Sequence, residues 1–321
     1  MASSSPAAQT ATAGGAIDIA PQTLHIGAEI SGVDLNQPLT AELQQQINEA
    51  LLQWKVVFFR DQNLDHAGHV ALARRFGEPT IGHAVFGHED GFPEVYSVAK
   101  NRTANSHREE RLATPWVGWH TDITAALNPP KIAILRGVTI PPFGGDTMWT
   151  NLAVAYDALS APIKALVDGL RTIHAFAPPP GAKSVEAYNE SVRRRTLKTE
   201  HPLVTVHPET GERLLFISPA FVKSIVGLSP RESQKILEML WEHLVRPEFT
   251  VRFKWNAGDI AMWDNRATAH LPPSDIYASD ADRQLYRVTL VGDIPHGIDG
   301  APSRSLEGAP IMSAAEELAS R

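Results

Sequence analysis

A histidine and an aspartate stand two residues apart in the segment WVGWHTDITAALNPP, which covers residues 116–130. If this segment is a strand, the side chains of His120 and Asp122 point to the same face, because residues two apart in a strand share a face. An imidazole and a carboxylate side by side provide two of the ligands for a metal ion. A surface pair of polar residues has the same pattern, so other residues are needed to choose between the two interpretations.

Three features further along the chain favour a metal site. His270 follows an apolar run in AMWDNRATAH, so the end of a strand can present it. Arg283 and Arg287 in RQLYRVTL would lie ~13 Å apart on one strand face, which predicts two anion sites at different depths. Two glycines in GGDTMW allow a tight turn before Thr147. Two histidines and a carboxylate suit the facial triad of non-haem iron(II), and an arginine suits the carboxylate of a bidentate organic acid.

The composition excludes other kinds of site and partner. The 321 residues include no cysteine, which rules out disulfides, thiolate ligands and a cysteine nucleophile. The net charge of −7 argues against nucleic acid, because phosphate binding requires concentrated Lys and Arg. No apolar run approaches the ~18 residues that span a bilayer. The N-terminal MASSSPAAQTATAGG lacks the basic cluster and apolar core of a secretory signal. We therefore expect a cytoplasmic protein that binds neither membranes nor nucleic acid.

Many short strands are expected to position these side chains. No regular alternation of strands and helices and no glycine-rich phosphate loop is present, which favours an antiparallel sandwich or barrel with helical decoration. The strand-like segments are 24–39, 55–61, 94–99, 131–140, 146–151, 201–218, 249–265 and 283–295.

Helical patterns occur in fewer places, over 41–54, 67–77 and 229–246. Residues 152–176 are expected to form two helices that break near Ser160. The helix at 229–246 has the clearest start, because Ser229 and Glu232 form a capping-box pattern around a proline at the first helical position.

The chain resembles the taurine dioxygenase, alkylsulfatase and 2,4-dichlorophenoxyacetate dioxygenase family of iron(II)/2-oxoglutarate-dependent oxygenases. The matching motifs are WHTD, GGDTMW, WDNRATAH and RQLYRVTLVGD, and looser similarity spans residues 22–300. The resemblance implies a mainly β fold with flanking helices, a double-stranded β-helix (jelly roll), over residues 21–300. Residues 1–20 are expected to be a disordered tail and residues 301–321 a C-terminal tail. Iron(II), 2-oxoglutarate, O2 and a homo-oligomer, a dimer or a tetramer, are also implied.

The resemblance also assigns roles to residues. His120, Asp122 and His270 match the iron ligands, while Thr147 and Arg283 match the residues that hold the far carboxylate of 2-oxoglutarate. Arg287 matches an arginine that grips the substrate anion in relatives acting on sulfonates or sulfates. The residues expected to contact the substrate are Arg287, His83, Ile123, Trp116 and Phe86.

The expected substrate is a small anionic molecule, and the segment after His270 bears on its identity. Close relatives read QHY where this chain reads AHLPP, so Leu271 and two prolines replace an aromatic and small residues next to the metal. With the long loops, this change favours a carboxylic acid of natural product biosynthesis. The alternative is a sulfonate or alkyl sulfate dioxygenase that releases sulfite or sulfate. A zinc hydrolase and a non-catalytic ligand-binding jelly roll are alternatives of other classes, but neither requires the arginine pair.

Overall fold

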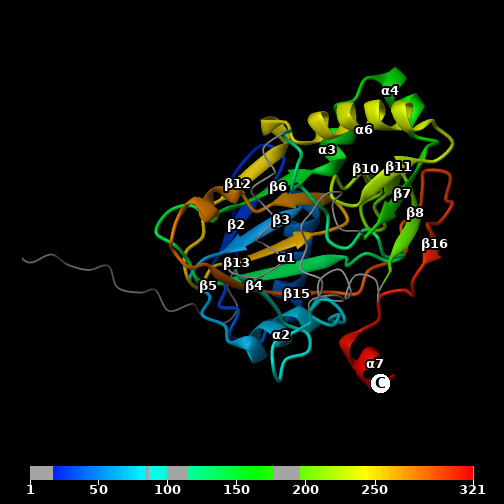
Figure 1. Cartoon of the computed structure of the whole chain (residues 1–321). Helices are drawn as coiled ribbons and strands as arrows, with labels where there is room; N and C mark the ends of the chain where they lie inside the picture. The colour runs from blue at the N-terminus through cyan, green and yellow to red at the C-terminus, as the bar shows by residue number, and fades with distance from the viewer. Residues whose placement is uncertain (1–16, 84–86, 100–113, 177–195, 321) are drawn as a thin grey trace, which may run out of the picture.

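The computed structural model describes residues 17–83, 87–99, 114–176 and 196–320, and this part of the chain is mainly β (Figure 1). The largest sheet has seven strands, and its pairs are antiparallel except for β2 with β3. In spatial order its strands are β1 (Asp18–Pro21), β2 (Ala28–Ser31), β3 (Val56–Phe59), β13 (Ile260–Asp264), β5 (Ile132–Thr139), β15 (Gln284–Thr289) and β4 (Tyr96–Ala99).

Three smaller sheets complete the β structure. One has the order β12 (Thr250–Phe253), β6 (Thr147–Asn151) and β14 (Thr268–Leu271). A second has the order β11 (Val222–Ile225), β7 (Arg171–Ala175), β8 (Lys198–Pro202) and β16 (Arg304–Glu307). The third is the hairpin of β9 (Val204–Val206) and β10 (Arg213–Leu215), which confirms the hairpin expected at 201–218.

Helices lie on the outside of these sheets. In Figure 1, α6 and α4 lie at the top, over the smaller sheets, and α2 lies at the bottom, against the large sheet. The helices are α1 (Ala41–Trp54), α2 (His66–Arg74), α3 (Leu152–Asp157), α4 (Ala161–Val167), α6 (Pro230–Leu244) and α7 (Ala314–Ala319), with 3-10 turns η3 (Pro247–Phe249) and η4 (Ser274–Ala278). The Ser229 capping box of α6 is formed as predicted.

Aromatic side chains between the large sheet and the β12–β6–β14 sheet form the core beneath the site. Trp149 of β6 packs edge-on against Phe58 of β3 and Trp263 of β13, with ring centroids 5.5 and 5.6 Å apart. Phe253 of β12 stacks on Phe58 at 4.1 Å. Every residue of β13 is buried, which explains why its first four residues, IAMW, form a continuous apolar run rather than an alternating one. This rigid layer carries the strands that present the functional side chains.

The structure corrects several expectations. Residues 171–175 were expected to be helical and instead form β7, whose inward residues Thr172 and His174 are polar, so the strand lacks an apolar alternation. β11 and β14 were not predicted. The limits expected for the domain and its tails stay predictions; β1 begins at Asp18, and β16 and α7 follow residue 300. Among the described residues, no helix combines the length and apolarity needed to cross a membrane.

Candidate metal centre

His120 and His270 face each other across an isolated antiparallel bridge. The backbone N–H of His120 donates to the carbonyl of His270 at 2.9 Å, and the N–H of His270 donates back at 2.7 Å. Directly opposed residues of an antiparallel pair carry their side chains on one face. The two imidazole centroids are therefore only 4.1 Å apart. His270 lies within β14 rather than after the preceding strand, and β14 positions His120 through this bridge.

Asp122 reaches the two histidines from a turn, so the expectation that His120 and Asp122 share a strand is wrong. Asp122 begins a turn, and Ile123 after it has a left-handed backbone with φ of 51°. The carboxylate nevertheless meets the imidazoles, with Asp122 Oδ1 3.9 Å from His120 Nε2. One ligand atom from each of His120, Asp122 and His270 lies within 4.8 Å of the others. The structure thus brings together the three residues singled out in the sequence.

The three side chains fit a divalent metal ion. His120 Nδ1 lies 2.9 Å from the carbonyl of Gly118, a contact that favours a proton on Nδ1 and leaves Nε2 as a ligand. Asp122 Oδ2 and His270 Nδ1 are buried and have no hydrogen-bond partner among the described residues. Buried polar atoms are nearly always partnered in native structures. A cation between these groups would provide the missing partner.

Arg287, one of the two arginines singled out in the sequence, forms an ion pair with the Asp122 carboxylate. Its Nη1 donates to Asp122 Oδ1 at 2.6 Å, and both side chains are buried. Burial raises the pKa of Asp122, but Arg287 and the two histidines outweigh it and lower that pKa to about 2. Burial, followed by the nearby His120, lowers the pKa of His270 well below its usual range. At neutral pH the carboxylate is therefore ionised and His270 neutral, which are the forms that bind metals.

Arg283 and Thr147 lie together at the other end of the site. Arg283 Nε donates to the carbonyl of Gly145 at 2.8 Å, and its Nη2 lies 3.4 Å from Thr147 Oγ1. The indole N–H of Trp255 donates to the same hydroxyl at 3.0 Å. A Cβ on Gly145, where φ is 70°, would lie 3.0 Å from Arg283 Cδ, so this turn needs glycine. The two arginines therefore contact different groups, Arg287 the Asp122 carboxylate and Arg283 the Gly145 carbonyl and Thr147. Arg283 lies just before β15, so the two anion sites expected from their spacing stay a prediction.

The remaining expected site residues are distributed more widely. The ring centroid of His83 lies 4.9 Å from that of Tyr96, and the guanidinium of Arg287 lies 5.3 Å from the Tyr96 ring. Ile123 is buried directly after Asp122. Trp116 packs against Trp241 of α6, with ring centroids 6.2 Å apart. Phe86 lies outside the described residues.

Two residues at the site were not singled out from the sequence. Trp255 supports Thr147, and Asn265 hydrogen-bonds to the backbone of Asp122 through its side chain. Asn265 lies within the quoted motif WDNRATAH, where a polar amide directly after a buried strand is the signal that could have identified it.

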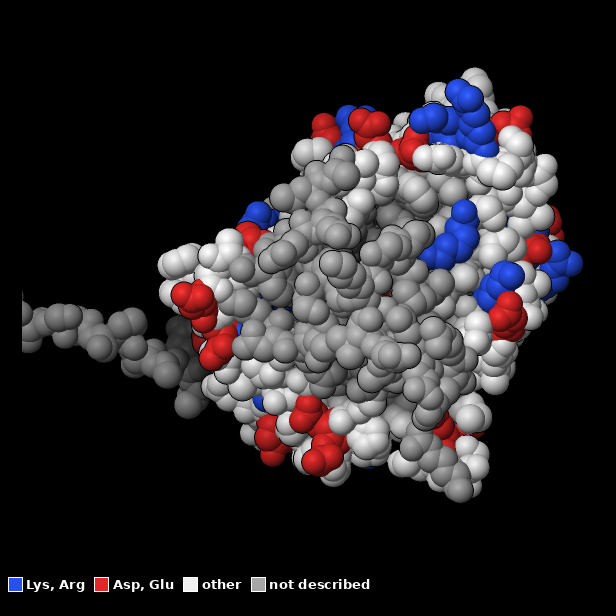
Figure 2. Space-filling view, viewed as in Figure 1, with Lys and Arg blue, Asp and Glu red and all other residues white. Residues whose placement is uncertain are grey.

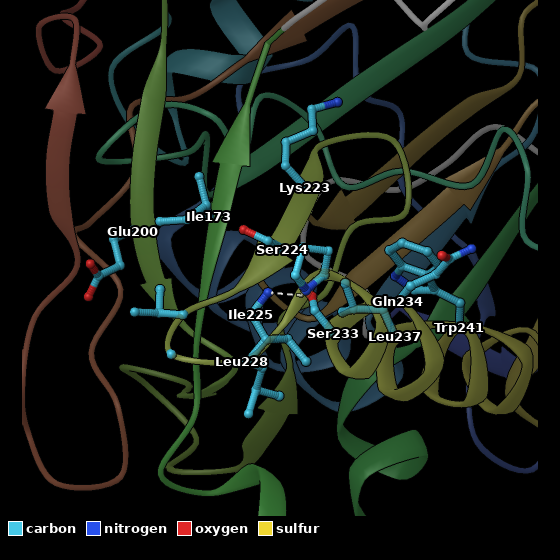
Figure 3. A pocket seen from close by; sticks show the side chains of 13 residues that line it. Ile173, Glu200, Lys223, Ser224, Ile225, Leu228, Ser233, Gln234, Leu237 and Trp241 are labelled. Carbon is cyan, nitrogen blue, oxygen red and sulfur yellow. Dashed lines mark hydrogen bonds between the residues drawn. The ribbon is translucent and has the colours of Figure 1, made fainter.

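A hollow of about 600 Å³ lies apart from these residues, between β11 and α6 (Figure 3). Lys223, Ser224, Ser233 and Trp241 are among its lining residues, and none of the expected site residues lines it. On the face shown in Figure 2, blue Lys and Arg side chains gather at the top and red Asp and Glu side chains at the bottom, with both signs present along the rim. Neither feature adds a group to the metal centre.

Comparisons with known proteins agree on one family. The family described as taurine catabolism dioxygenase TauD, TfdA family matches residues 18–289. An alpha-ketoglutarate-dependent sulfate ester dioxygenase of Pseudomonas putida is 39% identical over 299 residues, which cover 90% of this chain and 94% of that protein. An alkylsulfatase of Acinetobacter baylyi is 36% identical over 304 residues, covering 92% and 91%. The crystal structure of a taurine dioxygenase from Burkholderia xenovorans is 59% identical with a TM-score of 0.82, covering 93% of this chain and 98% of that one.

Proposed function

The chain belongs to the TauD, TfdA family and is an iron(II)/2-oxoglutarate-dependent dioxygenase, and we propose that its substrate is a small organic sulfate ester or sulfonate. The names of the similar proteins carry this choice. They favour the alternative reading of the sequence over the biosynthetic carboxylic acid that the AHLPP segment indicated. The AHLPP segment still differs from the QHY of close relatives, but this difference does not change the proposed class of substrate.

His120, Asp122 and His270 hold the iron in this proposal. The support is their mutual distance, the ionised carboxylate and the neutral His270. When bound, iron(II) and 2-oxoglutarate together activate O2 for the oxidation of a substrate C–H bond, with succinate and CO2 as further products. The chain contributes the position of the ligands and the exclusion of water from a buried site.

Thr147 and Arg283 hold the far carboxylate of 2-oxoglutarate. The Thr147 hydroxyl accepts hydrogen bonds from the Trp255 indole and from Arg283, so its own hydrogen can be donated to an anion. Arg283 is oriented by the Gly145 carbonyl and remains cationic at every physiological pH. A hydroxyl donor beside a guanidinium matches the needs of a carboxylate.

Arg287 holds the anionic group of the substrate. Its Nη1 is engaged with Asp122, while its Nε has no hydrogen-bond partner among the described residues. The guanidinium can therefore pair with a sulfate or sulfonate while it stays bound to the iron ligand. A substrate anchored there presents the carbon next to its anionic group to the metal. Hydroxylation of that carbon leads to an aldehyde, with release of sulfate from a sulfate ester or sulfite from a sulfonate.

We also propose a specific arrangement of the sheets. We place the large sheet and the smaller sheets as the two faces of a double-stranded β-helix, which their antiparallel pairing and the packing of Trp149 between them support. The domain limits at 21–300, a cytoplasmic location and a dimer or tetramer stay predictions. Light scattering in solution tests the last of these.

The substrate proposal is tested with a matched panel. The protein is incubated with iron(II), 2-oxoglutarate and O2 plus alkyl sulfates, alkyl sulfonates including taurine, or carboxylic acids of equal chain length. Succinate, sulfate and sulfite are then measured. We expect succinate in the presence of a sulfur compound, with one sulfate or sulfite released per succinate. Succinate formed with the carboxylic acids alone would overturn the proposal, and sulfate release without O2 would point to hydrolysis.

A further inference from the structure

The side chain of Asn265 holds both backbone groups of Asp122. Asn265 Oδ1 accepts from the Asp122 N–H at 2.9 Å, and Asn265 Nδ2 donates to the Asp122 carbonyl at 3.1 Å. Asp122 lies in a turn and, among the described residues, has no neighbouring strand to pair with. The side-chain amide of Asn265 takes the two backbone hydrogen bonds that a paired strand would otherwise make with Asp122. Asn265 is fully buried, so these hydrogen bonds do not compete with water.

The same amide also fixes the turn that follows the carboxylate. Asn265 Nδ2 donates a second hydrogen bond, at 2.8 Å, to the carbonyl of Pro130. Both ends of the segment 122–130 are thus tied to one side chain. Within this segment Ile123 has φ of 51°, a conformation that is costly for a β-branched residue and that persists where the surroundings enforce it. The Asn265 clamp is a surrounding group of this kind, one residue away.

Asn265 is itself held from behind by a buried charged network. Its backbone N–H donates to the carbonyl of Lys131 at 2.9 Å. The preceding Asp264 is fully buried, accepts from Arg266 at 2.9 and 2.7 Å and lies 2.8 Å from His207 Nε2. Because the backbone of Asn265 is fixed in this way, its side chain can fix the backbone of Asp122. Asn265 therefore stands between a rigid network and a metal ligand.

We propose that Asn265 is a positioning residue of the iron site. By fixing the backbone of Asp122, it directs the carboxylate to the point where His120 and His270 also meet. The inference rests on the ligand assignment of the proposed function. The neighbouring residues of the motif are held by other groups: His120 by the bridge to His270, and Thr121 by Ser218 at 3.1 Å. Loss of Asn265 thus frees the backbone of Asp122, whose carboxylate stays paired with Arg287, and leaves the two histidines in place.

The test is a titration with Mn(II), followed by the electron paramagnetic resonance signal of the free ion, which needs neither substrate nor turnover. We expect Asn265→Ala to weaken Mn(II) binding by about 10- to 100-fold, the range for partners of metal ligands. Saturating iron should then restore most of kcat, because the ligands themselves are intact. A loss of kcat that iron does not restore, at unchanged Mn(II) affinity, would contradict the proposal.

Asn151→Ala is the matched control. Asn151 is also buried and also makes three hydrogen bonds, accepting from the N–H groups of Ala153 and Val154 and donating to the carbonyl of His25. We expect this variant to lose thermal stability but to bind Mn(II) as the unmodified protein does. Equal Mn(II) affinity in the Asn265 and Asn151 variants would reduce Asn265 to a structural role and overturn the proposal.

Asn265→Asp serves the same titration if the alanine variant yields too little folded protein. It keeps the volume and the acceptor for the Asp122 N–H but loses both donors, so weaker Mn(II) binding is again expected and unchanged binding is again contrary. If the unmodified protein binds no Mn(II), the ligand assignment fails and Asn265 fails with it. If Mn(II) binds but no sulfur compound yields succinate, only the proposed substrate fails.

Discussion

The metal end and the co-substrate end of the site are held by different kinds of interaction. At the metal end, His120 and His270 share a backbone bridge, Asn265 clamps the backbone of Asp122, and Arg287 pairs with its carboxylate. All of these contacts are buried or nearly so. In such surroundings, removal of one partner leaves an uncompensated group and is strongly destabilising.

The co-substrate end depends on a more exposed set of charges. Arg283 is buried and donates to the carbonyl of Gly145, but the turn around Gly145 is tied down from outside. Arg252, whose side chain is 49% exposed, pairs with Asp146 at 2.6 Å and with Asp275 at 3.1 Å. Exposed pairs contribute little and are screened by salt. In the proposed assignment, buried contacts therefore hold the metal ligands, whereas the turn beside the 2-oxoglutarate residues depends on partly exposed ion pairs.

The largest effect is expected at the centre of the metal end. Asp122→Ala removes a ligand and leaves Arg287 buried without its carboxylate partner, so iron-dependent succinate formation should be abolished and Mn(II) binding lost. Asp146→Ala, at the co-substrate end, is the control and should keep most of the activity. Turnover retained by Asp122→Ala would contradict the assignment of the triad.

A smaller effect should separate the two arginines. Arg283→Ala removes the charged group proposed to bind 2-oxoglutarate, a contact worth roughly 1.5–3 kcal/mol, so the 2-oxoglutarate requirement should rise by about 10- to 100-fold. Arg287→Ala should weaken the sulfur substrate and also Mn(II), because Asp122 loses its partner. KM for each substrate and the Mn(II) titration measure these effects. Identical changes in both variants would show that the site does not have two separately held ends.

His201, which contacts the segment 122–130 after Asp122, should make folding stability depend on pH. His201 Nε2 lies 2.8 Å from the carbonyl of Thr124, and burial lowers the pKa of His201 to about 4. Below pH 6.5 the His201 imidazole becomes protonated in the unfolded chain but stays neutral in the folded protein. The free energy of unfolding therefore falls as the pH decreases towards 4. For this one group the loss between pH 7 and pH 5 is about 2 kcal/mol.

Urea unfolding of the unmodified protein and of His201→Gln at both pH values checks this prediction. The glutamine keeps a side-chain donor towards Thr124 but does not titrate. The variant should therefore lose less stability between pH 7 and pH 5 than the unmodified protein. An equal loss in both proteins would show that His201 is not held neutral by the fold.

The sequence predicted elements whose patterns are local. The helix expected at 229–246 is α6, because its capping box and its apolar spacing lie within one segment. β7 was missed because its buried residues Thr172 and His174 are polar and find their hydrogen bonds inside the fold. A polar residue on an inward face cannot be recognised from periodicity alone.

The metal ligands were predictable because they lie in motifs, but their support was not. Asn265 and Asp122 are 143 positions apart, and their contact exists only after β13 and the turn at 122–130 have come together. The strand geometry assumed for His120 and Asp122 failed for the same reason, since the turn at Ile123 depends on distant partners. Motifs thus pointed to the three residues that the structure brings together, whereas folding determined how the Asp122 carboxylate reaches the two histidines.

The smallest effect is expected for the exposed ion pairs of Arg252 beside the Gly145 turn. Arg252→Ala should raise the 2-oxoglutarate requirement only about two- to five-fold, because exposed pairs are worth about 0–1 kcal/mol. The difference from the unmodified protein should shrink between about 0.05 M and about 1 M NaCl, where screening suppresses exposed charges. Mn(II) affinity should not change. Arg246→Ala is the control, since Arg246 forms a similarly exposed pair with Glu248. An Arg252 effect as large as that of Arg283→Ala, and insensitive to salt, would mean that both ends are equally rigid.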